Sequence, residues 1–206
     1  GSNMGYLTFT DLRSRARSFE TLAAMSQSFP ILSGDNRDAE RSSAMRVSSS
    51  YFDMIGVKPA LGRAFTEAED QPGVARRVAI LTDGLWRRRF DADPAILGKP
   101  ILLSGTPFVV VGVMPKGFED LVGERMYTGA EMWVPLGYDP AASFACRTCR
   151  HLRVIGRLGP GATPAMAQEE ADALLAGLSK EHPTEYHEPG SRVIPLTEVF
   201  LGPVRT

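Results

Sequence analysis

Two cysteines and a histidine come close together in the last third of the chain, in the segment Cys146-Arg-Thr-Cys149-Arg-His151. Thiols at the C-x-x-C spacing can bind one side of a zinc ion or cycle between dithiol and disulfide. A closed zinc site needs four ligands, and the sequence has no second C-x-x-C or H-x₃-H pair to supply them. The haem attachment motif needs a histidine directly after the second cysteine, where Arg150 stands.

A redox pair usually lies at a helix N-terminus, which lowers the pKa of one thiol. The residues from His151 onward, HLRVIGRL, predict a strand instead. The segment therefore favours a local disulfide or inert thiols for Cys146 and Cys149 over weak metal binding with His151 and over redox catalysis. All three interpretations stay open on these residues alone.

The other groups of polar residues predict surface rather than a site. Histidines and acids gather at residues 182–188, but no rigid element holds a ligand geometry there. The acids of residues 67–70 and the pair Glu169-Glu170 are expected on polar faces, without the burial that general acid–base catalysis needs. The run Arg87-Arg88-Arg89 predicts a solvated helix face, with a docking patch as the minority alternative.

Two further motifs are better explained by local structure than by catalysis. The segment Gly156–Gly161 matches neither the dinucleotide nor the phosphate-loop fingerprint, and it predicts a turn followed by a helix cap. No G-x-S-x-G motif is present, and Ser48–Ser50 predict the cap of a short helix. No catalytic and no cofactor-binding residue is predicted.

These groups are carried by alternating helical and strand patterns. Apolar spacing predicts amphipathic helices over residues 8–24 and 163–180, the second begun by Thr163 and Pro164. The other expected elements are a hairpin over 29–47, a short helix from 51 to 56, a strand over 77–81 with a helix after Thr82 or Asp83, a helical turn at 93–98, a hairpin over 100–114, and strands over 131–136, 151–158 and 192–200. Long loops are expected at 115–130 and 137–150. Because hairpins argue against an all-parallel sheet, the pattern predicts an α+β fold with βαβ-like passages.

Composition is that of an ordinary globular domain. The chain has 206 residues, 43% of them hydrophobic and 23% charged, with a net charge of −1. This excludes a disordered chain and gives no field that would attract nucleic acid. The longest apolar run, Phe108–Met114, falls well short of the roughly 20 residues of a membrane span. Residues 1–4 are interpreted as an expression-tag remnant.

Three long segments together resemble a known family. They are VSSSYFDMIGVKPALGRAFT (47–66), VAILTDGLWRRRFDADPAILGKPILLSGTPFVVVGVMPKGF (78–118) and HLRVIGRLGPGATPAMAQEEADAL (151–174). The order of these motifs resembles the MacB-like periplasmic core domain, in particular that of duplicated permeases whose halves look like FtsX-type ABC transporter permeases. The resemblance covers most of residues 5–206. It implies a porter-like lobe of βαβ-type units and a second α/β lobe, with mixed sheets and hairpins, inserted at roughly 70–150.

The resemblance also implies a function. The domain would lie on the periplasmic side of the bacterial inner membrane, between transmembrane helices of the same chain. It would be non-catalytic, transmitting conformational change to or from the membrane spans and contacting substrate or a periplasmic adaptor during export. No cofactor is expected in the domain, because ATP would bind a separate nucleotide-binding domain or cytoplasmic subunit. An oxidising periplasm would make a disulfide between Cys146 and Cys149 reasonable.

Two alternatives remain beside this interpretation. One is a stand-alone periplasmic metal-binding or thiol-redox protein that uses the C-x-x-C segment. The other is a secreted ligand-binding module in which the loop Pro115–Ala130 covers a cleft.

Overall fold

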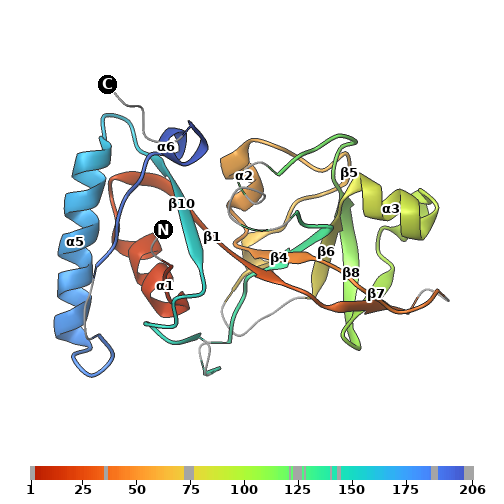
Figure 1. Ribbon diagram of the computed structural model, residues 1–206, viewed down its shortest axis with the longest axis horizontal. Coiled ribbons are helices and arrows are strands. Elements are labelled where there is room, and N and C mark those ends of the chain that lie inside the picture. Colours follow the sequence, from red (N-terminus) through yellow and green to blue (C-terminus); the bar gives the residue numbers. More distant parts are fainter. Residues whose placement is uncertain are drawn as a thin grey trace. The chain divides into compact units, whose positions relative to one another are not determined.

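A computed structural model describes residues 3–34, 37–71, 77–120, 122, 127, 129–139, 141–142, 145–186 and 190–201 (Figure 1). Its helices are α1 (Tyr6–Arg15), α2 (Tyr51–Ile55), α3 (Asp83–Phe90), α5 (Pro164–Glu181) and α6 (Leu196–Leu201), with 3₁₀ turns η1 (Glu67–Glu69) and η2 (Pro94–Ile96). Its strands are β1 (Phe19–Ser28), β2 (Ile31–Ser33), β3 (Glu40–Arg41), β4 (Ala44–Val47), β5 (Leu61–Gly62), β6 (Val78–Leu81), β7 (Pro100–Leu103), β8 (Thr106–Val113), β9 (Met132–Pro135) and β10 (Arg153–Leu158). This is the mixed α+β fold that the sequence predicted.

The chain divides into two compact units. Unit 1 comprises residues 1–22 and 140–206, and unit 2 comprises residues 23–139. Unit 2 is thus an insertion in the sequence of unit 1, and it begins well before residue 70, where the inserted lobe was expected to start. The early start follows from β1, whose last residues, from Met25 on, pair with β4.

Unit 1 is built from helices α1 and α5, strand β10 and the first residues of β1 (Figure 1). Helix α5 begins as the sequence predicted, with Pro164 in its first turn and the Thr163 hydroxyl accepting a hydrogen bond from the Met166 amide at 3.2 Å. One face of α5 is buried through Ala167, Ala171, Leu175 and Leu178. The face follows the helical repeat, so burial of apolar side chains stabilises this helix.

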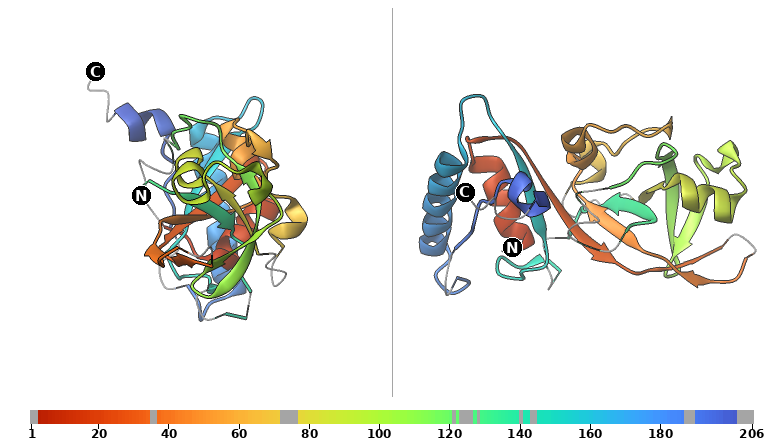
Figure 2. Two further views of the ribbon diagram at one scale, coloured as in Figure 1. Left: turned by 90° about the vertical axis from the view of Figure 1, so that its right-hand side faces the viewer. Right: turned by 45° about the horizontal axis from the view of Figure 1, so that its top comes forward.

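Unit 2 is a curled mixed sheet (Figure 2). Its strand order is β1-β4-β9-β6-β8-β7-β2-β3, with β5 paired to β8. The pairs β4–β9 and β6–β8 are parallel, and the other pairs are antiparallel. Strands β1 and β2 are separated only by Phe29 and Pro30, yet β1 pairs with β4 at one end of the order and β2 with β7 near the other. The sheet must therefore curl.

The inside of the curl holds the apolar core of unit 2. Strands β6 and β9 are buried along their whole length. The core contains Leu32, Ala44, Ala79, Leu81, Leu85, Ile96, Ile101, Leu103, Val110, Val113, Met132 and Val134. Helix α3 adds Leu85, and the Thr82 hydroxyl caps this helix by accepting from the Leu85 amide at 3.0 Å.

The helix predicted over residues 8–24 is wrong in its second half. Helix α1 ends at Arg15, and Phe19–Ser28 form strand β1. The amides of Arg17 and Ser18 donate to the carboxylate of Glu170, at 2.7 and 2.8 Å, which holds the backbone between the two elements away from a helical path. Strand pairing and burial outweighed the local helical spacing.

The last predicted strand is also wrong, and one hairpin is only partly correct. Residues 196–201 form helix α6, because Pro195 pre-sets a helical start and its carbonyl accepts from the Glu198 amide at 3.0 Å. In the hairpin expected over 29–47, β2 pairs with β3, but β4 pairs with β1 and β9 instead.

Candidate functional site

The cysteines lie in unit 1 and are joined to each other. A disulfide links Cys146 and Cys149, whose Cα atoms are 5.3 Å apart. The His151 ring is turned to the backbone, with Nδ1 2.6 Å from the carbonyl oxygen of Cys149. The residues that the structure describes hold no group of three or more histidines, cysteines and acids suited to a metal ion. Of the histidine-rich segment 182–188, His187 and Glu188 lie outside the described residues.

Arg147, which lies between the two cysteines in sequence, contacts two other segments of unit 1. Its guanidinium forms an ion pair with Asp11 of α1 and lies 3.5 Å from the carboxylate of Glu185. Its carbonyl oxygen accepts from the Thr8 hydroxyl at 2.8 Å, and Thr8 also bonds to the Tyr186 hydroxyl. The segment predicted as a chemical site therefore joins α1 to the chain that follows α5.

The acids of residues 67–70, expected at the surface, include two buried side chains. Glu69 is 5% exposed, and its carboxylate accepts from Arg63 at 2.7 and 2.9 Å and from the Thr66 amide at 2.8 Å. Burial alone would raise the pKa of Glu69, but the hydrogen bonds from Arg63 and Thr66 outweigh it and lower that pKa. The T-x-x-E spacing of a capping box was the available signal for this contact.

Asp70 is the second buried acid, and it connects two loops of unit 2. Its carboxylate oxygens accept from the Ser49 amide and the Gly137 amide, each at 2.9 Å. Both partners are distant in sequence, so no local pattern could have revealed the contact. The arrangement satisfies buried backbone donors and is a structural role.

A third buried carboxylate, Asp120, was missed by the sequence analysis. It accepts from the Tyr51 hydroxyl at 2.5 Å and from the Trp133 indole N–H at 3.2 Å. The rings of Tyr51 and Trp133 each meet Phe52 edge-on, with centroids 5.6 and 5.7 Å apart. Buried tyrosine and tryptophan need polar partners, which was the only signal for this acid.

The arginine run of α3 is the predicted solvated face at Arg87 and Arg88, but not at Arg89. Arg87 is exposed and pairs with Asp83, but the side chain of Arg89 is only 3% exposed and donates to the Asp38 carbonyl at 3.0 Å. The guanidinium nitrogens of Arg88 lie 2.9 Å from a carboxylate oxygen of Glu40 and 2.7 Å from one of Glu131. Hydrogen bonds from Arg88 lower the pKa of Glu40. The run binds the helix to neighbouring strands.

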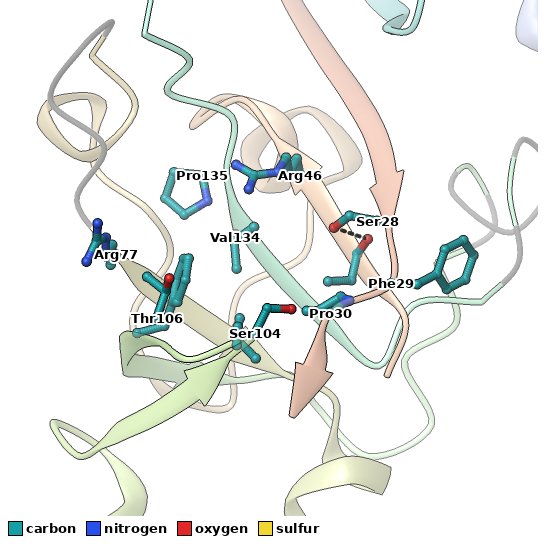
Figure 3. A pocket seen from close by; sticks show the side chains of 12 residues that line it. Ser28, Phe29, Pro30, Arg46, Arg77, Ser104, Thr106, Val134 and Pro135 are labelled. Atoms are coloured by element: carbon teal, nitrogen blue, oxygen red, sulfur yellow. Dashed lines mark hydrogen bonds between the residues drawn. The ribbon is translucent and has the colours of Figure 1, made fainter. Parts of the chain in front are cut away.

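Unit 2 also has an open pocket of about 500 Å³, which the sequence analysis did not foresee (Figure 3). Its lining residues are Ser28, Phe29, Pro30, Ala44, Arg46, Arg77, Leu103, Ser104, Thr106, Phe108, Val134 and Pro135. Leu103, Ala44 and Val134 belong to the core of the curled sheet, so the pocket is the open end of that core. Figure 3 shows Arg46 and Arg77 on either side of Pro135.

The remaining candidates have structural roles. Glu170 binds the amides after α1, and the Ser48 hydroxyl accepts from the Ala24 amide at 3.1 Å. The segment Gly156–Gly161 passes from β10 into the turn before α5, as predicted. No helix among the described residues has the length and apolar character needed to cross a bilayer.

These observations define an α+β domain of two compact units, and comparisons with known proteins identify its family. The model of the MacB-like periplasmic core domain matches residues 1–174. The chain therefore belongs to the family of MacB-like periplasmic core domains. A curated relative, the macrolide export ATP-binding/permease protein MacB of Chromobacterium violaceum, is 29% identical over 133 residues. That match covers 65% of this chain and 19% of the relative, so the chain spans about a fifth of that protein.

Solved structures have the same fold. The periplasmic region of MacB from Actinobacillus actinomycetemcomitans has a TM-score of 0.64 at 18% identity, covering 90% of this chain and 77% of that one. A domain of a putative permease from Porphyromonas gingivalis has the same TM-score and identity, covering 98% and 90%. The extracellular domain of the ABC-type transporter YknZ from Gram-positive bacteria is 16% identical, with a TM-score of 0.64 and coverage of 94% and 90%.

Proposed function

We propose that the chain is the non-catalytic extracytoplasmic part of an export permease. In this proposal unit 1 passes conformational change to or from membrane-spanning segments of the same chain, and unit 2 contacts the substrate or a periplasmic partner. ATP is hydrolysed on a separate nucleotide-binding domain or cytoplasmic subunit. The name of the Chromobacterium relative, which combines ATP binding with a permease, supports this division of labour.

The observation that carries the proposal is that unit 1 holds both described ends of the chain together. Arg15 of α1 and Glu181 of α5 form a bidentate ion pair, in which the two Nη atoms donate to the two carboxylate oxygens at 2.8 and 3.0 Å. Gln168 of α5 accepts from the Val193 amide at 2.7 Å and donates to the Ser191 carbonyl at 3.0 Å. A displacement applied at either end of the chain is therefore applied to a single compact unit.

The proposal is tested by following a distance across the chain during ATP turnover. Spin labels are placed at Ala165→Cys in α5 and Lys99→Cys in unit 2, both exposed positions, in the full-length permease with its ATPase. Double electron–electron resonance is recorded without nucleotide and after vanadate trapping with ATP. We expect the distance distribution to differ between the two states.

A control pair keeps the result interpretable. Labels at Lys99→Cys and Asp53→Cys, which is also exposed, lie within unit 2, and we expect their distance to stay unchanged. Identical distributions for the Ala165–Lys99 pair in every nucleotide state would overturn the transmission role.

The alternative of a metal-binding or thiol-redox protein makes a different prediction. It requires stoichiometric zinc or iron, or thiols that react in the native protein. The disulfide between Cys146 and Cys149 and the family membership weigh against it. Elemental analysis and thiol titration of the native chain separate the two functions, because a bound metal or two reactive thiols would favour the alternative.

A further inference from the structure

We propose that the pocket of unit 2 binds a small amphipathic anion, with a carboxylate or phosphate head held by Arg46 and Arg77 and an apolar body seated on the core of the curled sheet. The inference rests on the proposed function, which assigns substrate or partner contact to unit 2. The inference adds the chemical class of ligand that unit 2 would bind.

Charge is the first observation that favours an anion. The lining includes two arginines and no aspartate or glutamate, although the whole chain carries a net charge of −1. Elsewhere in the described chain, arginines such as Arg15, Arg63 and Arg88 are in ion pairs. Arg77 forms no such pair with a described residue, and Arg46 lies over the Tyr138 ring, 5.8 Å from its centroid. Guanidinium groups bind carboxylate and phosphate by paired hydrogen bonds.

The apolar lining favours a ligand with a hydrophobic body. Leu103 and Val134 are core side chains of the curled sheet, and Phe108 packs against that core. Phe29, also part of the lining, is 47% exposed and has the Arg41 guanidinium 4.9 Å from its ring centroid. Binding an apolar group here would remove both surfaces from water, which is favourable in proportion to the area covered.

Small residues explain why the curled sheet leaves room at this end. Ala44, Ser28, Ser104 and Thr106 all line the pocket, where larger side chains would fill it. Two of the hydroxyls already have partners in the chain. Ser28 donates to the Ala44 carbonyl at 3.4 Å, and Ser104 accepts from the Ile31 amide at 3.1 Å. The arginines are therefore the principal polar groups left for a ligand.

The size of the pocket favours a small molecule over a folded partner. A volume of about 500 Å³ lies within the range of small-molecule sites. A stable protein–protein interface would instead need a broad surface of about 800 Å² on each partner.

Binding is tested on the 206-residue chain with three probes. Decanoate carries both head and body, inorganic phosphate carries a head alone, and decanol carries a body alone. Calorimetry and amide NMR titration measure affinity and location. We expect decanoate to bind saturably and to shift resonances of the lining residues, and we expect the other two probes to bind at least about tenfold more weakly, since each lacks one set of contacts.

Substitutions then test which side chains bind decanoate. Arg46→Gln and Arg77→Gln should each weaken decanoate binding by about tenfold, whereas Arg46→Lys and Arg77→Lys should recover part of it. Arg157→Gln, at an exposed position of β10, is the matched control and should bind as the parent does. Thr106→Phe, which fills the pocket and leaves both arginines in place, should also weaken binding. Melting temperatures check that each variant is folded.

Several results would overturn the inference. Unchanged decanoate affinity in the Arg46→Gln, Arg77→Gln double variant would do so, as would equal affinity for decanol, or shifts confined to residues outside the pocket. Binding to the chain alone involves no transport. A failed spin-label experiment would therefore count against the transmission role and leave the binding result standing.

Discussion

Glu69 is a buried carboxylate whose charge is stabilised by its neighbours, so it links stability to pH. Its pKa is lowered in the folded chain, because the hydrogen bonds from Arg63 and Thr66 outweigh burial. A lowered folded pKa contributes stability that is present above the unfolded value, about 4.3, and is lost as pH falls through the folded pKa.

The first prediction follows from this linkage. Glu69→Gln should lower the free energy of unfolding at pH 7 by about 1–2 kcal/mol, a value reduced because Arg63 is half exposed. The difference from the parent should shrink as pH falls below about 4. Urea unfolding across this pH range measures both effects. Glu67→Gln, in the same turn but exposed, should change little. A difference that does not depend on pH would contradict the assignment.

The arginines of α3 give a second prediction at single residues. Arg89→Ala removes a buried guanidinium from the Asp38 carbonyl and from Glu40, 3.3 Å away, and should cost about 2–4 kcal/mol. Arg87→Ala, two positions earlier, removes an exposed guanidinium from its pair with Asp83 and from the Trp86 ring, and should cost about 0.5–1 kcal/mol. Thermal unfolding of both variants checks the contrast. Equal costs would mean that Arg89 is as solvated as its neighbour.

At the scale of elements, the start of α1 depends on a close backbone approach. A Cβ atom at Gly5, the residue before α1, would lie 2.1 Å from the Arg147 carbonyl oxygen. Gly5→Ala should therefore destabilise the chain by about 3 kcal/mol, because backbone must move. Gly177→Ala, in α5 with nothing within 4 Å of the added atom, should stabilise it by about 0.5–1 kcal/mol. Matching melting temperatures for the two variants would show that the approach at Gly5 is relaxed.

The sequence predicted those elements whose local pattern and long-range contacts favour the same structure. Helix α5 has a cap, a first-turn proline and an apolar stripe in one stretch of sequence, and the hairpin β7–β8 has a glycine turn between apolar runs. Strand β1 was not predictable, since its spacing also suits a helix and its partners are β10, more than a hundred residues away, and β4, which follows β2 and β3 in the chain. The pocket was missed for the same reason, because its lining comes from separate strands brought together only by the curl.

At the scale of the whole molecule, we expect the chain to be monomeric at micromolar concentration. Large apolar side chains that are exposed in the described part of the chain are few, namely Phe29, Ile31, Val109, Met166 and Phe200. A stable dimer usually buries about 1,200–2,000 Å² in total, with an apolar centre. Sedimentation velocity at several concentrations tests this fourth prediction. A concentration-independent dimer would contradict it.

The insertion of unit 2 within unit 1 sets an order for events during synthesis. All of residues 23–139 precede β10 and α5 in the chain, so unit 2 can complete its sheet before the later part of unit 1 is available. Helix α1 must wait for partners that follow it by well over a hundred residues, and its apolar face stays uncovered meanwhile. Because so long a loop closes slowly, we expect α1 to pack after the sheet of unit 2 has formed.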